Sequence, residues 1–219
     1  MIGIRTREEL ETAALLLDQG SPDKLRLLTR SIIDGLCTGR LASRSVGHPL
    51  GFVCFPVLRE GLDGLCVHAW LPGAVPPFTS ANAVHAHSWD LTSFVAVGSL
   101  GNQLHTAQEH DDGRYELYEV RSTSQDDEIR PTGRRVDVIG RPVSRERTGE
   151  VYRLPAGAFH LSDDHDAAPV VTLVLGTGRP DLVNLIVDRP GLAPRRTRRT
   201  EHTPDQTRRL AGRVRALLA

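Results

Sequence analysis

Residues 84–98, VHAHSWDLTSFVAVG, place two histidines one residue apart at the head of an apolar run rich in β-branched residues. Such a run predicts a β-strand. Because alternate residues of a strand point to the same face, we expect His85 and His87 to point the same way. The pair could provide two ligands of a metal site, or it could be two polar side chains at the mouth of a strand. A bound metal ion needs further ligands, so the rest of the sequence decides between these alternatives.

The sequence around this stretch is typical of a mainly β protein. Between residues 50 and 190, short runs rich in Val, Leu, Phe and Tyr are bounded by Gly, Pro and Asp. Many short strands of this kind indicate a sandwich or a small barrel rather than a βαβ fold. The DDGR sequence at 111–114 predicts a hairpin turn between two strands. The polar segment 122–135 predicts a surface excursion.

Helices are expected on both sides of the β-rich region. Thr6 followed by Glu9 predicts a capping box at the start of one helix. Ser21-Pro22 predicts the start of a second helix, with Ser as the N-cap. A similar capping pattern at residues 203–206 precedes a last helix.

Composition restricts the classes of function. The 219 residues contain 27 Lys plus Arg and 27 Asp plus Glu, so no global field attracts nucleic acid or anionic lipid. No apolar run is long enough to span a membrane, and the charged N-terminal stretch does not resemble a signal peptide. Cys37, Cys54 and Cys66 indicate buried thiols in a reducing, cytoplasmic protein. The RRTRR run at 195–199 lacks interleaved aromatic residues and is expected to be a solvated linker.

A second histidine motif lies in GEVYRLPAGAFHLSDD, residues 149–164. Pro155 and Gly157 predict a tight turn that ends one strand, and His160 then begins the next strand. The spacing of these three residues after Gly149 resembles the second conserved motif of the cupin superfamily. Only the last motif position differs, with Asp164 where the family usually has Asn.

The stretch around the first two histidines resembles the first cupin motif in part. His85, His87 and Gly98 stand at the family spacing. Thr79 replaces the leading glycine of that motif. Leu91 occupies the position where most cupins carry a metal-binding glutamate.

The resemblance covers roughly residues 50–190 and implies a cupin-type antiparallel β-barrel, a double-stranded β-helix. The fold class would then be mainly β, with N-terminal helices and a short C-terminal helix. On this division, residues 1–49 form a helical segment packed on the barrel, and 191–219 form a linker and the last helix. We expect a monomer or a homodimer.

The resemblance also implies a metal site built from His85, His87 and His160. Fe(II) is the expected ion, while Ni, Mn, Zn and Cu stay open because imidazole binds all of them. The three histidines without the glutamate resemble the cysteine and thiol dioxygenases among the cupins. The resemblance therefore implies a mononuclear non-heme iron dioxygenase that oxidises a small thiol or an amino acid such as cysteine with O₂.

Four further residues are candidates for the chemistry. Asp90 could be a fourth ligand, or it could accept a hydrogen bond from a histidine. His105 could be an acid or base, or an ordinary strand histidine. Arg59 could hold a substrate carboxylate, and Trp89 could pack at the barrel mouth or contact substrate. His68, in the middle of another strand, is expected to be a hydrogen-bonded structural residue.

Two alternatives to the dioxygenase remain. A cupin isomerase, lyase or hydrolase would use the same metal as a Lewis acid. A cupin that binds a metabolite without turnover would have a different class of function.

Overall fold

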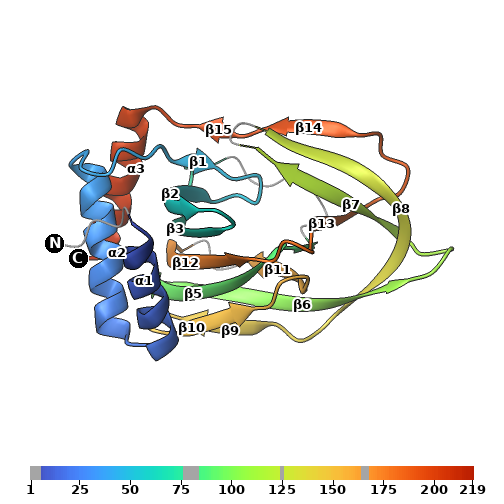
Figure 1. Ribbon diagram of the computed structural model, residues 1–219, viewed down its shortest axis with the longest axis horizontal. Coiled ribbons are helices and arrows are strands. Elements are labelled where there is room, and N and C mark those ends of the chain that lie inside the picture. The colour runs from blue at the N-terminus through green and yellow to red at the C-terminus, as the bar shows by residue number, and fades with distance from the viewer. Residues whose placement is uncertain (1–5, 76–83, 124–125, 164–167) are drawn as a thin grey trace.

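The computed structural model describes residues 6–75, 84–123, 126–163 and 168–219. Within these residues the fold is mainly β, with two antiparallel sheets and helices from both ends of the sequence (Figure 1). The predicted positions Thr79 and Asp164 lie outside the described residues. None of the described helices has the length and apolar character that crossing a membrane requires.

The first sheet, called sheet A here, contains seven of the described strands. Their spatial order is β10 (Val151–Leu154), β5 (Trp89–Val97), β12 (Val170–Gly178), β3 (Asp63–Trp70), β2 (Val53–Glu60), β1 (Val46–Gly47) and β15 (Thr200–Glu201).

The second sheet, sheet B, contains eight of the described strands and holds most of the predicted histidine motifs. Its order is β14 (Arg195–Arg198), β8 (Asp126–Gly140), β7 (Tyr115–Ser122), β13 (Asn184–Asp188), β4 (His85–Ala86), β11 (Phe159–Asp163), β6 (Ser99–Glu109) and β9 (Ser144–Arg147).

The helices begin where the capping patterns predict. Thr6 and Glu9 form the capping box of α1 (Arg7–Gln19), which ends at Gly20 in the left-handed conformation. Helix α2 spans Pro22–Cys37, and a second capping box starts α3 (Pro204–Leu217).

One face of sheet A packs against the three described helices and forms the largest apolar core. Apolar side chains at alternate positions of β2, β3 and β12 provide the sheet's share of it, because alternate strand residues share a face. They include Val53, Phe55, Leu65, Val67, Ala69, Val171, Leu173 and Leu175.

The opposite face of sheet A contacts sheet B. Leu100 of β6 packs with Phe52 and Trp70, and Leu104 of β6 packs beside Leu91. Side chains from the facing sides of the two sheets therefore pack together away from the helices. The two sheets form a partial ring (Figure 1), and closure into a cupin barrel stays a prediction.

The prediction of a hairpin at residues 111–114 is wrong. Strands β6 and β7 flank this turn in sequence, yet they do not pair; β8 lies between them, with Val136 opposite both Glu109 and Tyr115. The turn fits because Gly113 has no side chain: a Cβ there would lie 2.4 Å from the Val136 nitrogen.

The surface excursion predicted at 122–135 is also wrong, since most of this segment belongs to strand β8. Its acidic residues lie opposite arginines of a neighbouring strand. The arginine-rich run forms β14 beside it, with Arg196 opposite Glu128 and Arg198 opposite Asp126. The segment expected to be a linker therefore contributes a strand to sheet B and another, β15, to sheet A.

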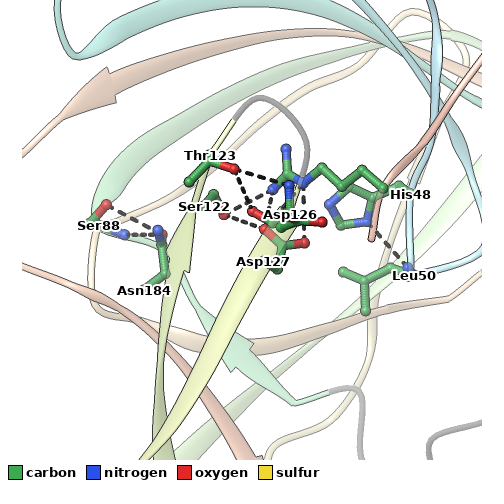
Figure 2. Close-up of polar contacts among 9 residues, drawn as sticks. His48, Leu50, Ser88, Ser122, Thr123, Asp126, Asp127 and Asn184 are labelled. Carbon is green, nitrogen blue, oxygen red and sulfur yellow. Dashed lines mark hydrogen bonds and ion pairs between the residues drawn. The ribbon is translucent and has the colours of Figure 1, made fainter. Parts of the chain in front are cut away.

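Arg199 anchors this region through a nearly buried carboxylate. Its guanidinium lies 2.7 Å from Oδ1 of Asp127 and 2.8 Å from Oγ of Ser122. Ser122 also donates to Asp127 over 2.6 Å, as Figure 2 shows. Asp127 is 6% exposed, so this arginine provides the charge that compensates it.

We predict that Arg199→Ala lowers the free energy of unfolding by about 3–5 kcal/mol, because it leaves the Asp127 carboxylate buried without its cation. Urea unfolding measures the change. The matched control is Arg198→Ala, which removes an exposed neighbour and should change stability by less than about 0.5 kcal/mol. Equal stability losses in the two variants would contradict the assignment.

Candidate metal centre

Two of the predicted ligands meet through strand pairing. His85 of β4 and His160 of β11 are direct partners in antiparallel register. Directly opposed side chains lie on the same face of a sheet. The two imidazole rings accordingly lie with their centroids 4.2 Å apart.

His87 follows β4 and is positioned by hydrogen bonds to its backbone neighbourhood. The Gly157 N–H donates to the His87 carbonyl over 2.8 Å. The next residue, Ser88, donates its N–H to Oδ1 of Asn184 over 2.9 Å (Figure 2) and accepts from the Arg179 N–H over 2.8 Å. The bond from Gly157 joins the two histidine motifs, and the bonds of Ser88 attach the first motif to β13 and to the residue after β12.

The three histidines satisfy the geometric requirement of a metal site. One ring nitrogen from each of His85, His87 and His160 lies within 4.8 Å of the other two. Metal–nitrogen bonds of about 2.0–2.1 Å place ligand nitrogens roughly 3–3.5 Å apart, so small side-chain rotations bring the set to bonding geometry. His85 and His160 are 7% and 2% exposed, which limits competition from water.

The surroundings favour neutral imidazole, the form that binds a metal. Burial, followed by the neighbouring imidazoles of His85 and His160, holds the pKa of His87 well below its usual value. Burial also lowers the pKa of His160. Nδ1 of His160 lies 2.9 Å from the Ala158 carbonyl. A carbonyl can only accept, so Nδ1 carries the proton and Nε2 keeps its lone pair for a metal.

Trp89 and Leu91 lie on the interior side of β5 and belong to one apolar cluster. The Trp89 ring stacks on His87 with a centroid separation of 4.1 Å and an interplanar angle of 20°. Leu91 is 7% exposed and packs with Leu154 and Val174. Trp89 thus covers one ligand with an apolar surface, and its contact with a substrate stays a prediction.

Asp90 lies between these two residues and interacts with the turn before His160. Its carboxylate accepts from the Ala156 N–H over 2.9 Å and from Nε of Arg179 over 2.8 Å. The Ala156 N–H, with a smaller contribution from Arg179, lowers the pKa of this carboxyl. Neither Asp90 nor any other carboxylate among the described residues belongs to the three-histidine donor group. The catalytic role of Asp90 stays a prediction.

The other two candidates are not members of the three-histidine group. His105 is opposite Phe159 on β11, so it points to the other face of sheet B from His160. There its Nδ1 lies 3.0 Å from the Gln103 carbonyl, and it lines a pocket with Tyr115 and other residues. Arg59 is exposed near the end of β2, opposite Gly64. The proposed roles of His105 and Arg59 remain untested.

A second donor group was not anticipated from the sequence. Cys54, Cys66 and His68 offer two sulfurs and a nitrogen, all within 4.8 Å of one another. His68 is hydrogen-bonded, as expected, and its partner is Cys66. The interaction with Cys66, and to a smaller extent that with His68, holds the pKa of Cys54 well below its usual value. The interaction with Cys54 raises the pKa of Cys66. The available signal was Cys66-Val-His68, which alternates along a strand like His85-Ala-His87.

We predict that the purified protein contains a first-row transition metal and that His160→Ala removes most of it, because two remaining histidines chelate weakly. Elemental analysis of both proteins measures this. His105→Ala is the matched control, since it changes a histidine on the adjacent strand and the opposite face. A folded His160→Ala protein with unchanged metal content would refute the site.

We predict that Asp90→Asn keeps its metal while activity falls roughly 10–100-fold, as for outer hydrogen-bond partners of ligands. The amide oxygen of Asn can still accept from Ala156, but the ion pair with Arg179 is lost. Metal content and circular dichroism are measured on the same sample. A folded but metal-depleted variant would instead make Asp90 a ligand.

Comparison of the sequence with known protein families and with curated proteins gives no match. The metal centre therefore rests on the convergence of the three histidines, and the cupin assignment remains a resemblance of two motifs.

Proposed function

We propose that this protein is a mononuclear non-heme Fe(II) dioxygenase of the cupin type, which oxidises a small thiol or an amino acid such as cysteine with O₂. The observation that carries the proposal is the buried group of three histidines, which has no carboxylate among its donors. Three neutral ligands on one metal leave positions for other ligands, and the full positive charge of the ion favours an anionic substrate. Leu91, in the slot of the usual glutamate, cannot reduce that charge.

The chain's own residues would keep the ligands neutral, oriented and dry. The Ala158 carbonyl accepts from Nδ1 of His160, which leaves the lone pair of Nε2 for a metal. Trp89 stacks on His87 and packs in one apolar cluster with Leu91, which would limit access of water to this ligand. Fe(II), when bound, would supply adjacent positions for the substrate heteroatom and for dioxygen. Holding both reactants at one place accelerates their reaction.

Asp90 acts in this proposal as a positioning residue. Its carboxylate holds the Ala156 N–H, and the next residue, Gly157, donates to the His87 carbonyl. Ala158 then orients His160. One short turn thereby connects the carboxylate to two of the three ligands. The salt bridge with Arg179 keeps the carboxylate in place.

Oxygen consumption tests the proposed function. The protein is reconstituted anaerobically with Fe(II), and O₂ uptake is followed with L-cysteine, cysteamine, 3-mercaptopropionate and a panel of amino acids. Uptake that depends on both Fe(II) and one of these substrates, and that disappears in His160→Ala, supports the dioxygenase. A metal-loaded protein without uptake on any of them would favour a Lewis-acid cupin or a binding protein.

We predict that Arg59→Ala raises KM for L-cysteine while leaving the metal content unchanged. The loss of a charge-assisted hydrogen bond to the substrate carboxylate corresponds to about 1.5–3 kcal/mol. Cysteamine, which lacks the carboxylate, provides a matched substrate whose KM should not change. Arg30→Ala, an exposed arginine on α2, is the control variant. Unchanged KM for cysteine in Arg59→Ala would exclude this role.

A further inference from the structure

A second set of metal-binding side chains lies on neighbouring strands of sheet A. Cys54 of β2 is the direct partner of His68 of β3, and Cys66 lies two residues before His68. All three side chains therefore project from the same face of the sheet. The Cys66 sulfur lies 3.2 Å from Nε2 of His68. The Cys54 sulfur lies within 4.8 Å of both of these atoms.

The separations agree with those in a tetrahedral metal site. Bonds of about 2.3 Å to sulfur and 2.0–2.1 Å to nitrogen give a sulfur–nitrogen separation of roughly 3.6 Å at a tetrahedral angle. The observed 3.2 Å lies within a few tenths of an ångström of this value. All three donor atoms lie within 4.8 Å of one another, so one ion can reach them after small side-chain rotations.

The register of β2 and β3 favours a metal over a disulfide. Cys54 is opposite His68, and Cys66 is opposite Pro56, so the two cysteines are diagonal neighbours. Diagonal pairs in antiparallel sheets have Cα atoms roughly 7–8 Å apart. A disulfide requires about 4.4–6.8 Å, whereas a metal inserted between two sulfurs spans a longer gap. The irregularity in this hairpin lies beyond Pro56, outside the Cys54–His68 pair.

The neighbouring strand contributes a buried hydroxyl group that lacks a protein partner. Thr172 of β12 is the direct partner of His68 on the other side of β3. It is 0% exposed, and its Oγ1 makes no hydrogen bond to any of the described residues. A buried hydroxyl without a partner is costly, and a water molecule on a metal would satisfy it. Phe52, whose ring lies 4.4 Å from that of His68, provides an apolar wall.

We propose that Cys54, Cys66 and His68 form a second metal site, specific for Zn(II), with a fourth position occupied by water. Two thiolates and one imidazole match the preference of Zn(II) for sulfur and nitrogen ligands. Three protein ligands plus one exchangeable position are typical of a catalytic rather than a structural zinc site.

The second site is chemically distinct from the three histidines, although both sets project from the facing sides of the two sheets. Trp89 stacks on His87 and belongs to the same apolar cluster as Cys66. The histidine site offers nitrogen alone, and the second site offers sulfur, so a soft ion distinguishes them.

Cobalt substitution tests this proposal independently of the proposed oxygenase. The full chain, reduced with a non-thiol reductant and freed of metal, is titrated anaerobically with Co(II). Thiolate-bound Co(II) gives intense charge-transfer absorption in the near ultraviolet, which a three-histidine site cannot produce. We expect this absorption, saturating at one equivalent, in His160→Ala, where the histidine site is removed. Added Zn(II) should abolish it by displacement.

The control variants assign the sulfur ligands. Cys54→Ser and Cys66→Ser should each lose the absorption, while Cys37→Ser, which changes the cysteine at the end of α2, should retain it. Circular dichroism confirms that each variant is folded, and double mutation of Cys54 and Cys66 to Ala provides a second test. Absence of the absorption in folded, reduced His160→Ala would overturn the proposal. A disulfide between Cys54 and Cys66 that persists under the same reductant would also overturn it.

Discussion

The pairing of His85 with His160 is the interaction on which the histidine site depends. Strand β4 is short, so its register comes from its neighbours: Ile186 of β13 on one side and β11 on the other. Strand β11 is in turn held by five successive pairs with β6. A slip by one residue would turn His160 to the opposite face of the sheet, where His105 points. The long pairing with β6 thus determines which residues share the interior.

The turn between β10 and β11 adds His87 to the pair formed by His85 and His160. Gly157 has a φ of 76°, a conformation that a residue with a side chain adopts at a cost. In this conformation its N–H reaches the His87 carbonyl. Asp90 binds the preceding N–H and Ala158 binds the His160 ring. The spacing of proline, glycine and histidine in the sequence therefore determines both the turn and the hydrogen bonds that hold His87 and His160.

Local patterns predicted much of this structure, and cross-strand relations explain what they missed. The capping box of Thr6 and Glu9 depends only on residues close in sequence, so the sequence was enough to predict it. The same holds for the alternation of the first two histidines. Strand β8 was missed because its charged side chains are matched by arginines far along the chain. The convergence of Cys54 with Cys66 depends on the register of β2 and β3, which no periodicity reveals.

The interleaved order of strands has a consequence for how the protein folds. Val46 of β1 pairs with Glu201 of β15, and β8 enters between two strands that precede it in the chain. Such contacts between distant segments give a high contact order, and proteins of this kind fold over milliseconds to seconds. During that time the sheet edges are open to pairing with other chains. Metal ions that bind only the native arrangement would shift this equilibrium by mass action, so metal supply and folding yield would be linked.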